Sequence, residues 1–170
     1  MTSIRAEPSI EPMAVTDWDE VRRIYLEGIA TGQAKFETGA PSWDQWDAAH
    51  LPFARLVARQ ENGLAGWAAL SPVSQRSVYR GVAEVSVYVA EHQRGLGIGR
   101  KLLNALITDS EQNGIWTLQA GVFAENEGSL VLHQSCGFRE VGRRERIGRL
   151  HGAWHDTILL ERRSTIAGVE

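Results

Sequence analysis

Cysteine is nearly absent from this sequence of 170 residues, which contains only Cys136. One cysteine excludes an internal disulfide framework and a metal site built from four thiolates, and we expect it to be a small buried residue. Long apolar runs are also missing. No window approaches the roughly 20 apolar residues of a membrane span, and residues 1–12 contain no run of signal-peptide length. These absences predict a cytoplasmic protein that has no membrane partner.

A large excess of charge of either sign is missing as well. The 18 basic and 21 acidic residues give a formal net charge of −3, and the only basic run, residues 143–149, is typical of a solvated strand face. Nucleic-acid-binding proteins usually carry a large basic patch, so the composition argues against a nucleic-acid partner. No pair of histidines or acidic residues has the spacing of a metal site, and we expect no metal. The expected partners are small molecules.

Hydrophobic residues make up 43% of the chain, which is enough for one core in a single domain over residues 1–163, followed by a loose tail over 164–170. Thr16-Asp17-Trp18-Asp19 and Ser42-Trp43-Asp44-Gln45 have the pattern of capping boxes and predict two helix starts. Asn62-Gly63 predicts a hairpin whose two turn residues both have positive φ. The expected strands cover residues 9–13, 56–60, 64–70, 81–89, 117–122, 138–146 and 154–161. Their alternation with helices predicts an α/β fold, a central mixed sheet flanked by helices.

A glycine-rich turn joins the expected strand 81–89 to a helix that is expected to end at Asn113-Gly114. The turn reads Gln93-Arg94-Gly95-Leu96-Gly97-Ile98-Gly99. It lacks the Gly-Lys-Ser/Thr of a nucleotide-hydrolase loop, and its position and spacing do not fit a dinucleotide-binding fingerprint. Backbone N–H groups, the helix dipole and two flanking arginines, Arg94 and Arg100, favour an anion such as a pyrophosphate. A turn that only changes the chain direction is the alternative.

The strand before this turn carries one carboxylate, Glu84, among β-branched residues. Strict alternation predicts that Glu84, Ser86 and Tyr88 lie on the face opposite the valines. A carboxylate in a strand built for burial is costly unless it has a partner or a task. We interpret Glu84 as a general base that deprotonates an amine, directly or through water. A structural ion pair with Arg80 is the alternative.

The glycine turn resembles the Q/R-x-x-G-x-G/A motif that binds coenzyme A in the GNAT superfamily of N-acetyltransferases, and Asn126, Leu132 and Gly137-Phe138 resemble its closing motif. Four separate segments in the same order, AKFETGAPS, VYRGVAEVSVYV, SLVLHQSCGF and GAWHD, resemble the phosphinothricin and methionine sulfoximine acetyltransferases. The resemblance covers most of the chain. It implies the GNAT acyl-CoA N-acyltransferase fold, acetyl-CoA as the acetyl donor, and a homodimer.

The resemblance also implies which residues form the site. The pantothenate arm of acetyl-CoA would lie like an extra strand beside the main chain of Val87, Tyr88 and Val89. Other contacts to acetyl-CoA would come from Arg94, Gly95, Leu96, Gly97, Ile98, Gly99, Arg100, Asn126 and Ser135. The substrate would be bound by Phe36, Ser77, Val78, Tyr79 and Arg80.

His133 stands where many superfamily members carry a tyrosine that acts as an acid toward the departing thiolate. The phosphinothricin subgroup also has histidine there. We therefore expect His133 to take or return a proton near neutral pH, and a hydrogen-bonded packing residue is the alternative. His155, in the segment GAWHD, is expected at the pocket rim or at an oligomer contact.

These interpretations predict an enzyme that transfers an acetyl group from acetyl-CoA to the α-amino group of a small amino acid, such as phosphinothricin or methionine sulfoximine. The anionic group of that substrate is expected to meet Arg80. Two alternatives stay open: a non-catalytic acyl-CoA-binding sensor on the same fold, and an acetyltransferase for peptide N-termini or polyamines.

Overall fold

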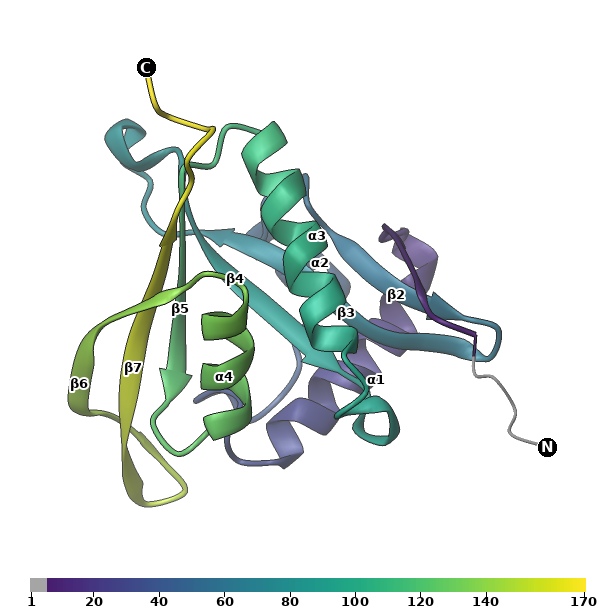
Figure 1. Ribbon diagram of the computed structural model, residues 1–170. Helices are drawn as coiled ribbons and strands as arrows, with labels where there is room; N and C mark the ends of the chain where they lie inside the picture. The colour runs from purple at the N-terminus through teal and green to yellow at the C-terminus, as the bar shows by residue number, and fades with distance from the viewer. Residues whose placement is uncertain (1–5) are drawn as a thin grey trace.

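The computed structural model describes residues 6–170, so the first five residues of the expected domain 1–163 lie outside the described residues. Seven strands form one sheet in the order β1-β2-β3-β4-β5-β7-β6 (Figure 1). Only β4 and β5 are parallel, and every other neighbouring pair is antiparallel. The strands are β1 Ser9–Pro12, β2 Leu56–Gln60, β3 Gly63–Pro72, β4 Val82–Val89, β5 Thr117–Phe123, β6 Arg139–Leu150 and β7 Ala153–Arg163. The expected mixed sheet is confirmed.

Helices cover both faces of this sheet (Figure 1). They are α1 Trp18–Ala30, α2 Trp43–Ala49, α3 Ile98–Gln112 and α4 Glu127–Ser135. One core lies between the sheet and helices α3 and α4, and Leu102, Leu103 and Leu106 of α3 are fully buried in it. The second core lies under α1 and α2 and is largely aromatic, with Trp46 and Trp67 at its centre. No helix within residues 6–170 has the length and apolar character that a membrane span requires.

The two expected capping boxes differ in outcome. Ser42 caps α2 as expected, because its Oγ accepts from the Gln45 N–H at 3.3 Å and its own N–H donates to Gln45 Oε1 at 3.1 Å. The box expected at Thr16 is wrong. A 3₁₀ turn, Val15–Asp17, precedes α1, and Asp17 instead accepts from the Ala14 N–H at 2.9 Å and binds Arg59 of β2 at 2.9 Å. The Asp17 side chain therefore both closes the 3₁₀ turn and pairs with Arg59, and no side chain caps α1.

The expected hairpin between β2 and β3 is confirmed, but its turn is shifted by one residue. Gln60 pairs with Gly63, so Glu61 and Asn62 form the turn. Of the two residues expected at positive φ, only Gly63 has one, at 119°. A register shift between Ala58 and Arg59 absorbs the difference, which is the usual effect of a β-bulge beside a short turn.

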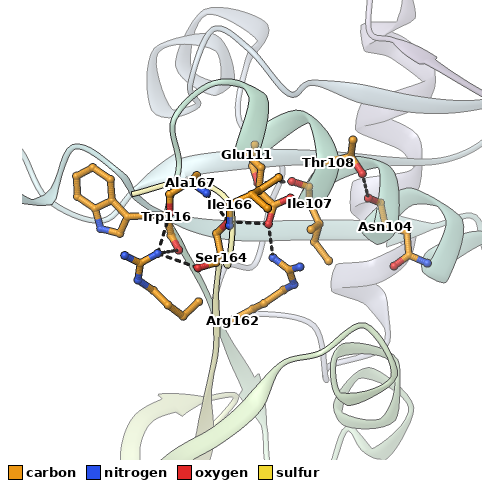
Figure 2. Close-up of polar contacts among 11 residues, drawn as sticks. Asn104, Ile107, Thr108, Glu111, Trp116, Arg162, Ser164, Ile166 and Ala167 are labelled. Carbon is orange, nitrogen blue, oxygen red and sulfur yellow. Dashed lines mark hydrogen bonds and ion pairs between the residues drawn. The ribbon is translucent and has the colours of Figure 1, made fainter. Parts of the chain in front are cut away.

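The residues that follow β7 lie against α3 and the loop before β5 (Figure 2). Ser164 and Ala167 are buried, and the Ser164 N–H donates to the Trp116 carbonyl at 2.8 Å. Ser164 Oγ donates to Glu111 Oε1 at 2.8 Å and accepts from the N–H groups of Ile166 and Ala167. Ser164 therefore joins residues 164–167 to Glu111 and Trp116, and the loose tail over 164–170 stays a prediction.

Candidate active site

The site begins where β4 and β5 separate. The two parallel strands pair only at Val82, Ala83 and Glu84 of β4, although β4 continues for five more residues. Beyond Glu84 the β5 side of β4 has no partner strand, so its main-chain N–H and C=O groups face an opening. A cavity of about 710 Å³ occupies this opening and is lined by residues 84–89 of β4 and 120–122 of β5. Val87, Tyr88 and Val89 line this cavity, and their contact with acetyl-CoA stays a prediction.

The glycine turn forms one end of this cavity. Gly95 and Gly97 have φ of 76° and 81°, a region that residues with a side chain rarely adopt. At Gly99 a Cβ would lie 3.3 Å from Leu132 of α4, so glycine there permits close approach of the two helices. The first N–H groups of α3 have no partner within the helix and point out of its N-terminus. This set of donors fits a diphosphate.

Arginine side chains add positive charge to the turn. Arg94 and Arg100 line the cavity together with Gly95, Gly97, Ile98 and Gly99. Arg94 Nε donates to the carbonyl of Val89 at 3.3 Å, which ties the turn to the end of β4. Leu96 is 54% exposed and is not part of the lining, so its contact with acetyl-CoA stays a prediction.

Glu84 lies at the point where the strands part. Its Oε1 is 3.9 Å from the position that a Cβ on Gly121 of β5 would occupy, so glycine leaves room beside the carboxylate. Among the ion pairs of residues 6–170 none involves Glu84. Arg80, the alternative partner, instead stacks over Trp116 at 5.5 Å from the ring centre. The structural ion pair considered for Glu84 is therefore not formed.

His133 lines the same cavity from α4. Its Nδ1–H donates to the Ser129 carbonyl at 2.7 Å, an assignment that leaves the Nε2 lone pair as an acceptor. Burial lowers the pKa of His133 below its usual value, and the hydrogen bond to Ser129 opposes this only in part. The ring is consequently neutral at pH 7, and burial disfavours the positive charge that a second proton would bring.

Asn126 and Ser135, the two expected contacts on α4, are placed differently. Asn126 caps the helix by accepting from the Ser129 N–H at 3.2 Å, and its Nδ2 donates to the Gln33 carbonyl at 3.2 Å. It lines the cavity. Ser135 does not, because it lies at the far end of α4, where its Oγ donates to the Leu132 carbonyl at 2.7 Å.

The expected substrate residues are not brought to the cavity. Ser77, Val78 and Tyr79 form an exposed 3₁₀ turn, and neither they nor Arg80 line it. Phe36 packs instead against Phe123, with ring centres 4.7 Å apart, and fills the space above Gly148. Next to it, His155 bonds to Glu125 at 2.5 Å. These aromatic contacts hold the segment between α1 and α2 against β5, β6 and β7.

A second cavity, of about 470 Å³, lies on the α1 and α2 face of the sheet. Lys35 lines both cavities, and its Nζ donates to Ser86 Oγ at 3.4 Å. The sequence analysis did not single out Lys35. Two features of the sequence could have indicated this residue. Lys35 precedes Phe36 in the segment AKFETGAPS, and Ser86 shares a strand face with Glu84. Within residues 6–170 no group of acidic, histidine or cysteine side chains could hold a metal ion.

The glycine turn and most of the sheet fall within the part of the chain that matches a known family. The model of the acetyltransferase (GNAT) family matches residues 14–138. The chain belongs to this family. The expected fold and the expected acetyltransferase class are thereby confirmed.

Relatives within the GNAT family agree with the expected subgroup. The chain is 37% identical over 155 residues to the phosphinothricin N-acetyltransferase of Alcaligenes faecalis, covering 86% of this chain and 77% of that protein. It is 29% identical to the L-methionine sulfoximine/L-methionine sulfone acetyltransferase of Pseudomonas paraeruginosa, over 90% and 92% of the two chains. The crystal structure of a phosphinothricin acetyltransferase from Sinorhizobium meliloti with acetyl-CoA has a TM-score of 0.88 and 26% identity, covering 97% and 92%.

Proposed function

We propose that this GNAT protein transfers an acetyl group from acetyl-CoA to the α-amino group of a small amino acid related to phosphinothricin or methionine sulfoximine. The observation that carries the proposal is the cavity that leads from the glycine turn, along the unpaired edge of β4, to Glu84. The extended arm of acetyl-CoA would lie beside β4 and join the diphosphate at the glycine turn to the thioester, which would meet the substrate amine near Glu84. The names of the relatives support the choice of substrate class.

In the proposed reaction, acetyl-CoA supplies the thioester, and the chain supplies positions for charge and protons. Glu84 takes the proton from the substrate ammonium, because only a neutral amine can attack the acetyl carbonyl carbon. N–H groups on the unpaired edge of β4 donate to the carbonyl oxygen as negative charge develops on it. The C–N bond forms, the nitrogen gives up its remaining surplus proton to Nε2 of His133, the C–S bond breaks, and that proton passes to the departing thiolate. His133, neutral at rest, relays protons through Nε2.

A substrate panel tests the proposal. Purified protein would be incubated with acetyl-CoA and phosphinothricin, methionine sulfoximine, a peptide with a free N-terminus or a polyamine, and release of the coenzyme A thiol would be measured. We expect turnover with the first two and at least tenfold lower kcat/KM with the peptide and the polyamine. Tight binding of coenzyme A without thiol release for any amine would favour the acyl-CoA sensor. Preference for the peptide would move the proposal to protein N-termini.

The proposal includes the homodimer that the resemblance implies and the cytoplasmic location that the lack of long apolar runs predicts. Light scattering at micromolar concentration tests the assembly, with a mass near twice the 18.8 kDa of the chain as the expected result. A mass equal to that of one chain over the whole concentration range would contradict it.

A further inference from the structure

Lys35 is an unusual cation in this chain. The sequence contains two lysines, Lys35 and Lys101, while all other basic side chains apart from histidine are arginines. Lys101 forms an ion pair with Glu7 on the surface, at 2.6 Å. Lys35 is half-buried and lines both cavities of the site. It therefore differs from Lys101 in burial, in partners and in its access to a ligand.

The ammonium of Lys35 has few contacts to satisfy it. It donates to Ser86 Oγ at 3.4 Å, and within residues 6–170 it has no carboxylate within ion-pair distance. An ammonium carries three donors, so two stay available. Burying a cation without a counter-ion is unfavourable, and an anion that enters the cavity would offset that cost. The segment around it is held in place by Phe36 against Phe123.

The position of Lys35 relative to Glu84 matches one class of ligand. Glu84 and Ser86 are two residues apart on the same face of β4, a spacing of about 7 Å. The Glu84 carboxylate and the Ser86 hydroxyl, to which the Lys35 ammonium donates, thus extend from strand positions about 7 Å apart. An α-amino acid carries an ammonium and a carboxylate on one carbon, and a hydrogen bond at each end spans this distance. The site therefore offers a carboxylate, Glu84, to the ammonium of the ligand and an ammonium, Lys35, to its carboxylate.

The second cavity offers a place for the rest of such a molecule. It opens beside Lys35 and is lined by apolar and aromatic groups such as Pro41 and Trp46, together with the Glu37 carboxylate. Burial lowers the pKa of His50, another lining residue, to about 4, and the charges of Lys35 and Arg55 act in the same direction. His50 is neutral at pH 7, so Lys35 is the one cation in the described lining of this cavity.

We propose that Lys35 binds the carboxylate of the acceptor amino acid, holding its α-amino group at Glu84 and directing its side chain into the second cavity. This inference rests on the proposed function and sharpens it, because it makes the α-carboxylate a requirement for binding. It assigns to Lys35 the role that the sequence analysis gave to Arg80, whose guanidinium stacks over Trp116 and lines neither cavity.

The test compares methionine sulfone with its carboxamide, which keeps the α-amine and the side chain but has no carboxylate. For Lys35→Met we expect KM for methionine sulfone to rise about 10- to 100-fold, the loss typical of a charge-assisted hydrogen bond, with kcat within about threefold of wild type. KM for the carboxamide should not change. Lys35→Arg should recover most of the lost affinity, and Lys101→Met, the same substitution outside both cavities, should behave like wild type.

Other outcomes overturn the inference. An equal loss for acid and carboxamide would make Lys35 structural, and no change for either would remove it from the site. Loss of the carboxylate preference in Arg80→Met but not in Lys35→Met would return the role to Arg80.

If wild type transfers no acetyl group to any amine, the proposed function fails. Calorimetric binding of methionine sulfone in the presence of coenzyme A then decides the inference separately: it stands if wild type binds and Lys35→Met does not, and it fails otherwise.

Discussion

At the scale of single residues, the site contains two groups that could carry a proton, and these two groups have different surroundings. Glu84 stands where β4 and β5 part and forms no ion pair within residues 6–170, whereas His133 is buried on α4 and holds its Nδ1–H on the Ser129 carbonyl. A neutral imidazole cannot donate to a thiolate until it has first gained a proton. Burial lowers the pKa of His133 and so disfavours a second proton on its ring, which favours Glu84 as the first acceptor of the ammonium proton.

Replacement of Glu84 by glutamine tests this assignment. Glu84→Gln keeps the shape of the side chain but removes the base, so kcat should fall about 10²- to 10⁴-fold while the affinity for acetyl-CoA stays near that of wild type. Raising the pH should partly restore the rate, because more of the substrate amine is then neutral without help. Steady-state kinetics from pH 6 to 10 and calorimetry with coenzyme A measure both quantities.

His133→Asn is the matched variant, because an amide nitrogen can still donate to the Ser129 carbonyl while the Nε2 lone pair is lost. We expect a smaller loss of kcat than for Glu84→Gln. If His133→Asn abolishes turnover and Glu84→Gln leaves kcat and its pH profile unchanged, His133 is the base and Glu84 has only a structural role.

At the scale of elements, the turn between β4 and α3 needs a positive φ and open space beside the N-terminus of α3, and glycine meets both needs. Gly97 is the N-cap of α3 at a φ of 81°, and it lines the cavity where N–H groups of the helix N-terminus converge. A side chain at this position is strained, and it also projects toward the space proposed for the diphosphate.

Gly97→Asp and Gly97→Asn separate strain from charge. The two side chains have nearly the same size, and both tolerate the left-handed conformation better than most residues do. We expect Gly97→Asn to weaken coenzyme A binding by less than about tenfold and Gly97→Asp by a further tenfold or more, because a carboxylate repels the diphosphate. Calorimetry with coenzyme A measures the difference, and circular dichroism verifies folding. Equal affinities for the two variants would show that the turn does not hold the diphosphate.

At the scale of the whole molecule, the C-terminal residues are hydrogen-bonded to the C-terminal part of α3, the helix whose N-terminus belongs to the site. Glu111 of α3 accepts from Arg162 at 2.8 Å and from Ser164 Oγ at 2.8 Å (Figure 2). Arg163 donates to the Ala167 carbonyl at 2.9 Å and to the carbonyl of Gly168. These bonds join β7 and the C-terminal residues to α3, the helix whose N-terminus forms the glycine turn.

The pKa of Glu111 makes this contact sensitive to acid. Burial raises the pKa of its carboxyl, but hydrogen bonds from Arg162 and Ser164 outweigh burial and hold it below the usual 4.5. A group whose pKa is lowered in the folded state stabilises the fold above its unfolded pKa, and that contribution is lost as the pH falls through the folded pKa. Glu111 should therefore stabilise the protein at pH 7 and progressively less below about pH 4.5.

Glu111→Gln should lower the free energy of unfolding at pH 7 by about 1–3 kcal/mol, or roughly 2–12 °C in Tm for a chain of this size. The difference from wild type should shrink as the pH is lowered from 5 to 3. Glu61→Gln, in the exposed turn of the β2–β3 hairpin, serves as the control and should change Tm by less than about 2 °C. Thermal unfolding followed by circular dichroism checks both variants, and a pH-independent difference for Glu111→Gln would contradict the ionic origin.

Local sequence determined the elements and much of the phosphate end of the site. The alternation of β4, the positive φ of Gly95 and Gly97, and the cap of α2 by Ser42 follow from steric and hydrogen-bonding preferences within a few residues. For the same reason Glu84 could be singled out as a lone carboxylate in a buried strand. The cap at Thr16 is not formed because Thr16 lies inside a 3₁₀ turn, Val15–Asp17, and α1 begins only at Trp18.

Only the tertiary structure decided which distant segments share the cavity. Main-chain hydrogen bonds between strands do not depend on side-chain identity, so the sequence could not indicate that β4 and β5 pair over three residues and then part. Lys35 and Ser86 are 51 residues apart and meet only because the segment after α1 folds across β4. Arg80 precedes Glu84 by four residues, yet it stacks on Trp116 outside both cavities. Proximity along the chain fixed local geometry, whereas packing between elements fixed the composition of the site.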